Sequence, residues 1–168
     1  MMRLTPFFVL LPLTACVRAP PPQTAATAPR FSAQAFFAGA THGEGRLKVA
    51  FAAAKTTVVE GRGHVESDGT LVLDQIVTQA SAKPQRRQWR ISEVTPGRYA
   101  GTLSDAAGPV SGDASGNRLH LHFHMKGELV ADQWLDLSAD GQVAQNRMVI
   151  AKLGVTVATL DETIRRVR

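Results

Sequence analysis

Hydrophobic and polar residues alternate along most of the chain after Gly45, and turn-forming residues interrupt this alternation at regular intervals. A period of two residues is typical of strands whose two faces meet different surroundings. The interruptions include Ser67-Asp68-Gly69, Pro96-Gly97 and Asp140-Gly141, which contain residues that favour tight turns. Ten strands are predicted: Arg46–Ala54, Thr57–Glu66, Thr70–Gln79, Gln85–Val94, Arg98–Ser104, Val110–Ala114, Arg118–Lys126, Asp132–Ser138, Val143–Leu153 and Val155–Ile164.

Short strands at a spacing of about ten residues favour an antiparallel barrel or sandwich. No stretch after Gly45 shows a convincing helical stripe. At the end of the chain, however, Leu160, Ile164 and Val167 also fit one face of a helix, so the end of the last strand stays open. Phe31–Gly39 is expected to form a short helical turn or an extended segment that closes one end of the fold.

Residues 1–15 have the features of a signal peptide. Arg3 precedes an apolar stretch, Leu4–Leu13, that is too short to cross a hydrocarbon core of about 30 Å. Leu13-Thr14-Ala15-Cys16 resembles the bacterial lipobox, in which the cysteine is lipidated and becomes the first residue of the mature protein. The alternative is a plain secretory signal with an incidental cysteine. The lipobox interpretation is favoured because Cys16 is the sole cysteine of the chain.

A lipidated Cys16 would hold the protein to a membrane through its acyl chains. Residues 16–30 contain Pro20-Pro21-Pro22, and this composition favours an extended tether rather than a core. Val17 follows the cysteine, where an aspartate would resemble an inner-membrane retention signal. We therefore expect a cell-envelope protein anchored at the periplasmic face of the outer membrane, with its folded domain at residues 31–168.

The composition excludes several classes of protein. A chain of 168 residues, 44% of them hydrophobic, fits one globular domain and does not fit a disordered protein. One cysteine permits neither an intramolecular disulfide nor a zinc site made of several thiolates. The formal net charge of +5 is modest and the basic residues are scattered, so no nucleic-acid partner is predicted.

Three histidines alternate with apolar residues in the predicted strand Arg118–Lys126. His120, His122 and His124 share one face of this strand, and the aliphatic residues share the other. Two histidines at this spacing can ligate one metal ion, but the outer pair is about 13 Å apart, too far for a single ion. We favour a strand whose histidines face water, and keep a metal site completed by His42 and His64 as the alternative.

The segment Arg87-Gln88-Trp89 also alternates, which places Arg87 and Trp89 on one face of a strand. An inward Arg87 would stack on the indole and plug one end of a barrel, or would instead bind an anionic head group at its mouth. Asp132 and Trp134 likewise share a face, and Asp132 is a candidate partner for Arg87 or Arg147.

Catalysis and cofactor binding find no support in the sequence. The chain contains no Gly-x-Ser-x-Gly motif, and its one thiol lies at the predicted anchor. Gly61-Arg62-Gly63 lacks the strand–turn–helix context of a phosphate-binding loop. We therefore expect a protein without catalytic residues and without a cofactor.

Eight short motifs occur in order between about residues 36 and 155. They are Phe36-Phe37-Ala38-Gly39, Gly43-Glu44-Gly45, Leu71-Val72-Leu73-Asp74, Arg87-Gln88-Trp89, Tyr99-Ala100-Gly101, Asp132-Gln133-Trp134, Asn146-Arg147 and Lys152-Leu153-Gly154. In this combination the chain resembles a family of bacterial lipoproteins, Domain of Unknown Function 3833. The resemblance implies a lipocalin-like, up-and-down barrel of about eight to ten strands on a lipid anchor, with no established activity.

Three positions depart from the pattern of that family. Gln75 stands where the family usually has an acidic residue, and Ala131-Asp132 stands where it usually has two acids. Ala82-Lys83-Pro84 replaces a turn that usually reads Asp-Gly. A site built from paired carboxylates in relatives is therefore not expected here.

The favoured hypothesis is a non-enzymatic lipoprotein whose barrel binds or shuttles an apolar or lipid-like ligand. The candidate ligand-binding residues are Arg87, Trp89, Asp132, Trp134, Asn146 and Arg147. The alternative is a tethered interaction module that docks on another envelope protein without a ligand. A third hypothesis, an enzyme acting on envelope lipid, lacks an identifiable acid–base pair.

Overall fold

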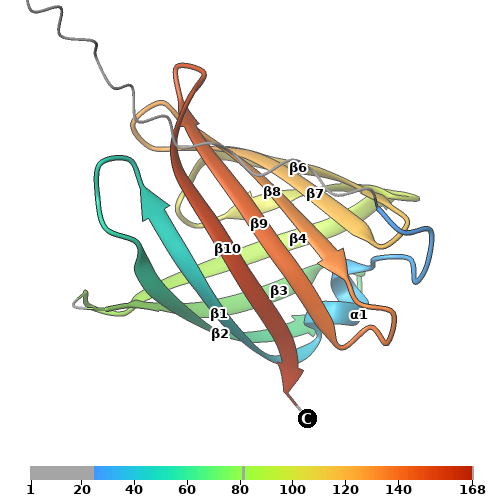
Figure 1. Cartoon of the computed structure of the whole chain (residues 1–168). Coiled ribbons are helices and arrows are strands. Elements are labelled where there is room, and N and C mark those ends of the chain that lie inside the picture. The colour runs from blue at the N-terminus through green and yellow to red at the C-terminus, as the bar shows by residue number, and fades with distance from the viewer. Residues whose placement is uncertain (1–24, 81, 168) are drawn as a thin grey trace, which may run out of the picture.

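Ten antiparallel strands form a closed barrel in the computed structural model, which describes residues 25–80 and 82–167 (Figure 1). Each strand pairs with its neighbours in sequence, and β1 pairs with β10 to close the sheet. The elements are α1 (Ala33–Phe37), β1 (Gly39–Val49), β2 (Lys55–Val65), β3 (Leu71–Gln79), β4 (Gln85–Thr95), β5 (Arg98–Leu103), β6 (Ala106–Ser115), β7 (Arg118–Met125), β8 (Leu129–Leu137), β9 (Val143–Lys152) and β10 (Val155–Val167). The prediction of an all-β, up-and-down barrel is confirmed.

The strand bounds differ from the prediction most at β1, and by three or four residues at one end of β6, β8 and β10. The glycine-rich start of β1 looked like a loop, so the predicted start at Arg46 was wrong. Gly43 and Gly45 face inward there, and a Cβ at either position would collide with Glu162. β10 is one continuous strand to Val167, and the helical alternative at the end of the chain is wrong because β1 and β9 hold it on both sides.

One end of the barrel is closed by α1 and the residue before its cap. The Ser32 hydroxyl accepts a hydrogen bond from the Ala35 backbone and caps the helix. Phe31, Phe36 and Phe37 are buried, with ring centroids 5.8 Å and 4.9 Å apart in successive pairs. These rings fill the inside of the barrel at the closed end, as the sequence predicts for Phe31–Gly39.

The last part of the predicted tether lies against the closed end. The Ala26 backbone N–H donates to the Asn117 side chain, and the Asn117 N–H donates to the Ala26 carbonyl. Arg30 forms an ion pair with Glu93 at 3.0 Å. Among the described residues no helix is long and apolar enough to cross a membrane.

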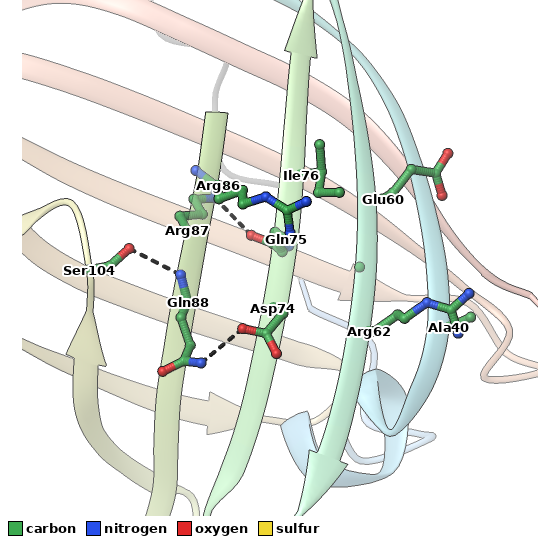
Figure 2. Close-up of a pocket in the computed structure, with 11 residues that line it drawn as sticks. Ala40, Glu60, Arg62, Asp74, Gln75, Ile76, Arg86, Arg87, Gln88 and Ser104 are labelled. Carbon is green, nitrogen blue, oxygen red and sulfur yellow. Dashed lines mark hydrogen bonds between the residues drawn. The ribbon is translucent and has the colours of Figure 1, made fainter. Parts of the chain in front are cut away.

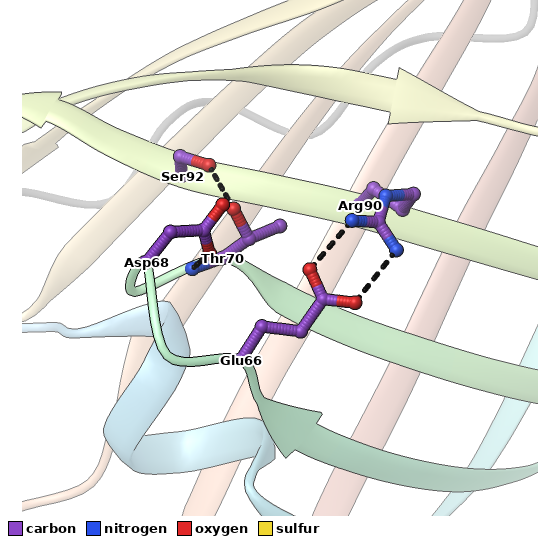
Figure 3. Close-up of polar contacts among 5 residues, drawn as sticks. All are labelled: Glu66, Asp68, Thr70, Arg90 and Ser92. Carbon is purple, nitrogen blue, oxygen red and sulfur yellow. Dashed lines mark hydrogen bonds and ion pairs between the residues drawn. The ribbon is translucent and has the colours of Figure 1, made fainter.

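The β2–β3 turn, also at the closed end, is held by polar contacts (Figure 3). The Asp68 carboxylate accepts a hydrogen bond from the Thr70 backbone at 2.9 Å, which lowers the pKa of Asp68. Arg90 on β4 binds both carboxylate oxygens of Glu66, at 3.1 Å and 2.6 Å. The acidic turn is thereby tied to the neighbouring strand.

The opposite end of the barrel, which we call the open end, carries the turns β1–β2, β3–β4, β5–β6, β7–β8 and β9–β10 (Figure 1). In the β9–β10 turn, Leu153 and Gly154 have φ values of +49° and +78°. Two successive positive φ values are typical of a type I′ turn, in which Asn-Gly is the favoured pair. Leu153 is 81% exposed, so neither its backbone angle nor its surroundings favour leucine.

Leu153→Asn should therefore raise the free energy of unfolding by about 1 kcal/mol, because asparagine tolerates the left-handed conformation that leucine resists. Urea denaturation would measure the change. Val155→Asn is the matched control, because Val155 is exposed in the same hairpin and has no positive φ. A Leu153→Asn variant no more stable than the wild type would contradict the prediction.

Candidate ligand-binding site

Buried polar side chains form a layer across the middle of the barrel. On β3 and β4, the Gln75 side-chain oxygen accepts two hydrogen bonds, from Arg87 Nε at 2.7 Å and from Trp89 Nε1 at 2.9 Å. The Arg87 guanidinium also lies 5.9 Å from the centre of the Trp89 ring (Figure 2 shows the bond between Arg87 and Gln75). Gln75 thus fixes both side chains on the inner wall of the barrel.

A second chain of hydrogen bonds crosses β8, β9 and β10. Gln133 Nε2 donates to Asn146 Oδ1 at 3.0 Å, and Asn146 Nδ2 donates to Glu162 Oε2 at 2.6 Å. The other carboxyl oxygen, Glu162 Oε1, is buried and has no hydrogen-bond partner among the described residues. Glu162 itself is only 5% exposed. Since a buried polar atom normally has a partner, this oxygen marks a place where a ligand or proton can bind.

Burial moves the pKa values of the two ionisable groups in this layer towards their neutral forms. It raises the pKa of Glu162, against the opposing effects of the Asn146 hydrogen bond and the positive charge of Arg87. Burial likewise lowers the pKa of Arg87, against the attraction of Asp105 and Glu162. Burial therefore works against the charge of Glu162, while the arginine keeps its charge.

The guanidinium of Arg87 has hydrogen-bond donors that no described residue accepts from. Its Nε donates to Gln75, but its two terminal nitrogens donate to no acceptor among the described residues. No carboxylate forms an ion pair with it in the described part of the chain. A cation inside a protein is usually paired, and the parallel donors of a guanidinium match a carboxylate or phosphate.

A cavity of about 490 Å³ lies between this layer and the open end. Its wall is mainly apolar, and Arg87 lies among the lining residues, so the cavity reaches the polar layer. The apolar lining residues are Leu47, Val59, Val77, Met125, Met148, Ile150 and Leu160. A smaller space of about 30 Å³ lies within the layer and is lined by Arg87, Trp89, Gln133 and Glu162 among others. The interior is therefore closed at one end, polar in the middle and hollow at the other end.

The outer surface carries a larger hollow of about 790 Å³ over β2, β3 and β4 (Figure 2). Most side chains around it are exposed and polar, including Arg62, Arg86 and Asp74. Asp74 already accepts a hydrogen bond from Gln88. The inner cavity is the better candidate for an apolar ligand, because seven large apolar side chains line it, whereas Ile76 alone does so in the outer hollow.

The histidine strand, β7, places its histidines on the outer face and its apolar side chains inside, as we favoured from the sequence. Asp132 Oδ1 on β8 lies 2.9 Å from both His120 Nε2 and His122 Nδ1. Burial acts to raise the pKa of Asp132, but the hydrogen bonds from His122 and His120 outweigh it and the pKa is lowered. The suggested pairing of Asp132 with Arg87 or Arg147 is therefore wrong.

Other contacts complete this outer cluster. The His120 ring stacks on Trp134 with centroids 5.1 Å apart, and its Nδ1 lies 3.4 Å from Asp113. His42 is elsewhere, on β1, where it contacts Glu44 and Glu60. In the described ranges, no group of three or more His, Cys, Asp or Glu side chains has the arrangement of a metal site.

The six candidate ligand-binding residues therefore divide between the two faces of the wall. Arg87, Trp89 and Asn146 face inward and belong to the polar layer. Asp132 and Trp134 lie in the outer histidine cluster, and Arg147 forms an ion pair with Asp161 at 3.2 Å on the outside.

Sequence reasoning overlooked three inward polar residues: Gln75, Gln133 and Glu162. The alternation of inward and outward positions along a strand could have identified two of them. Gln133 falls between the outward Asp132 and Trp134, and Glu162 falls between the buried Leu160 and Ile164. Gln75 was noticed only as a departure from a family pattern.

The family model described as Protein of unknown function (DUF3833) matches residues 10–166. The chain belongs to this family. The family resemblance of the short motifs is thus confirmed. No protein of curated function matches the sequence.

Solved structures similar to this DUF3833 barrel share its fold at low sequence identity. The S-type phycobiliprotein lyase CPES from Guillardia theta is 6% identical, with a TM-score of 0.65 and coverage of 80% of this chain and 90% of the lyase. Rv2717c from M. tuberculosis is 16% identical, with a TM-score of 0.63 and coverage of 79% and 94%. These likenesses confirm a lipocalin-like barrel.

A third structure is a protein of unknown function from the DUF3598 family of Nostoc punctiforme. It is 11% identical, with a TM-score of 0.62 and coverage of 83% of this chain but only 51% of that protein. This chain therefore corresponds to about half of that protein.

Removing the charge of Glu162 should make stability less sensitive to pH. Because the folded state raises the pKa of Glu162 above its ordinary 4.5, the stability this group contributes is full below that value. It is lost as pH rises through the folded-state pKa. Glu162→Gln should therefore gain stability relative to the wild type as pH rises, and the two proteins should converge near pH 4.5.

Urea denaturation between about pH 4 and pH 8 would measure this difference. Glu128→Gln is the control, because Glu128 is exposed in the β7–β8 turn. A Glu162→Gln effect that stays constant over the pH range would contradict the expectation.

Proposed function

We propose that this protein is a membrane-anchored envelope lipoprotein that binds or shuttles a lipid-like ligand inside its barrel and has no catalytic activity. The ligand is an amphiphile with an apolar chain and an acidic head group. The chain occupies the apolar cavity, and the head group lies against Arg87 at the polar layer. Two features of the interior support this assignment, and the second one carries it.

The first feature is the shape and chemistry of the cavity. Its volume of about 490 Å³ lies within the range of about 300 to 1,000 Å³ common for small-molecule sites. The cavity is closed below by the polar layer and by α1, and it opens at the far end of the barrel. A linear apolar chain that enters from the open end would therefore be held lengthwise with its leading group at the layer.

The second feature is the free end of the Arg87 guanidinium. Both terminal nitrogens lack an acceptor among the described residues, and Gln75 and Trp89 hold the side chain in place. The group is thus a positioned pair of donors at the base of an apolar cavity. A carboxylate or phosphate would supply the missing acceptors and place a negative charge in direct contact with the guanidinium.

Binding is proposed in place of catalysis because the candidate general bases face away from the cavity. His120 and His122 lie on the outer face with Asp132. The polar layer offers amides, an indole, a guanidinium and Glu162, whose raised pKa favours the protonated form. An acid–base pair aimed at a ligand is therefore not assembled by these residues.

Oleic acid and oleyl alcohol share one apolar chain and differ in the head group, so they separate the two parts of the proposed site. Displacement of a fluorescent fatty acid would measure both affinities. Gln75→Glu is nearly isosteric and places a carboxylate beside Arg87, so it should weaken binding of the acid by roughly 10- to 100-fold. Binding of the alcohol should change little. Arg87→Gln should have the same selective effect.

Arg62→Gln is the matched control, because Arg62 is an exposed arginine on the outer face of β2. It should leave both affinities unchanged. Equal losses for acid and alcohol in Gln75→Glu would contradict the head-group site. If neither probe binds, and native mass spectrometry of the gently purified protein finds no lipid, ligand binding is wrong and the interaction-module hypothesis is favoured.

The anchor is a separate part of the proposal and rests on Cys16, which lies outside the described residues. Cys16→Ser should leave the barrel folded, because every described strand begins after residue 38. Intact-mass spectrometry should find the wild-type chain starting at Cys16 with diacylglyceryl and acyl groups, and the variant without them. An unmodified Cys16 in the wild type would contradict the anchor and the envelope location together.

A further inference from the structure

Large apolar side chains project from the turns at the open end of the barrel. Phe51 in the β1–β2 turn is 92% exposed, and Leu153 in the β9–β10 turn is 81% exposed. Val155 and Val49 beside them are 65% and 41% exposed. The two turns are neighbours, because the Ala50 N–H donates to the Val157 carbonyl at 2.8 Å. Together Val49, Phe51, Leu153 and Val155 form an apolar rim.

Folding stability does not account for this rim. Phe51 and Leu153 both have positive φ values, +61° and +49°, which glycine or asparagine would adopt with less strain. Neither side chain gains from burial within the chain. Phe51 and Leu153 thus combine an unfavourable backbone angle with high exposure to water, at two adjacent turns. This combination indicates a contact with a partner outside the barrel.

The lysines also lie at the open end of the barrel. The chain contains five lysines, and all are exposed at the open end. They are Lys48, Lys55, Lys83, Lys126 and Lys152. None forms an ion pair with a described residue. The apolar rim is therefore surrounded by unpaired positive charge, and only Asp105 and Glu128 oppose it in the turns at this end.

The turns of the closed end differ in charge from those of the open end. They carry the acidic residues Glu66, Asp68 and Asp140, and Glu66 is already bound by Arg90 (Figure 3). Val65, Val94 and Val167 are also exposed at that end, but no lysine lies near them. Exposed arginines such as Arg98 and Arg165 do lie at the closed end, but no exposed apolar side chain described there is as large or as exposed as Phe51 and Leu153.

We propose that the open end docks on an anionic phospholipid bilayer. Phe51 and Leu153 enter the interface between head groups and acyl chains, and the lysines contact the anionic head groups. Apolar tips ringed by basic residues match the two layers of such a surface. This surface goes beyond the proposed ligand site. It would place the mouth of the cavity against the bilayer, so that an acyl chain could enter without crossing water.

The length of the chain before the barrel is compatible with this orientation. The first described residues lie at the closed end, where Ala26 bonds to Asn117. The nine residue steps from Cys16 to residue 25 span at most about 30 Å. The barrel wall is about 25 Å high, from ten-residue strands tilted by about 40°. A lipid on Cys16 could thus enter the same bilayer that the open end contacts.

Depth-dependent quenching of tryptophan would test the proposal on the full chain. Phe51→Trp, Leu153→Trp and, as the control at the closed end, Ala139→Trp would each be mixed with phosphatidylglycerol vesicles carrying brominated acyl chains. Trp89 and Trp134 are common to all three variants, so each is compared with the wild type. Additional quenching is expected for residues 51 and 153 and not for residue 139. Quenching at residue 139 that equals or exceeds the others would overturn the proposal.

The contribution of charge is tested in the Phe51→Trp background. Lys55→Gln with Lys152→Gln should reduce the quenching in phosphatidylglycerol vesicles at least threefold. Arg98→Gln with Arg165→Gln removes the same charge from exposed positions at the closed end and should have no effect. Equal quenching in pure phosphatidylcholine vesicles, or equal losses in the two double variants, would overturn the role of the lysines and of an anionic surface.

A second copy of the chain is the competing occupant of the rim. Sedimentation without vesicles would reveal it as a dimer that Leu153→Asp dissociates, and this result would overturn the proposal. A monomer in solution that binds vesicles through residues 51 and 153 supports it. The oleic acid measurement uses no vesicles, so failure of docking and failure of ligand binding are distinguished.

Discussion

Closure of the sheet by the pairing of β1 with β10 is the constraint on which the remaining structure depends. A barrel of about eight strands has an interior that side chains can just fill, so ten strands leave more space than a simple apolar core occupies. The chain fills this space unevenly. Phenylalanine rings and α1 occupy the closed end, a hydrogen-bonded layer crosses the middle, and the open end stays hollow. The cavity thus results from the number of strands and from the position of the large side chains at the closed end.

The polar layer contains both a cation, Arg87, and an acidic group, Glu162. Arg87 keeps its charge in a largely apolar interior because Gln75 and the indole of Trp89 stabilise it without neutralising it. Glu162 lies close enough for the two charges to interact, yet burial favours its neutral form. In the proposed site the charge of Arg87 attracts an anionic head group. An acidic residue at position 75 would oppose that attraction, so an amide there has a direct chemical consequence.

Alternation of residue character predicted ten strands and a shared face for Arg87 and Trp89, because both depend on local geometry. It could not predict which residues meet across strands. Asp132 lies opposite His122 because β7 and β8 pair in that register, and no property of either strand alone indicates it. Glu162 was missed because the last strand also fitted a helical pattern. The start of β1 was missed because its glycines, read locally, resemble a loop, whereas they are required by the Glu162 side chain lying over them.

The pairing of β1 with β10 also orders events during synthesis. Leu47 meets Leu160, so the two strands that close the barrel lie at opposite ends of the folded chain. Until the last strand has been made, β1 and β9 remain unpaired edges, and the carboxyl group that completes the polar layer is absent. Contacts between residues so far apart in sequence form late and slowly. The growing chain consequently passes through a stage with an open, apolar-lined trough, and the cavity comes into existence only when synthesis is nearly complete.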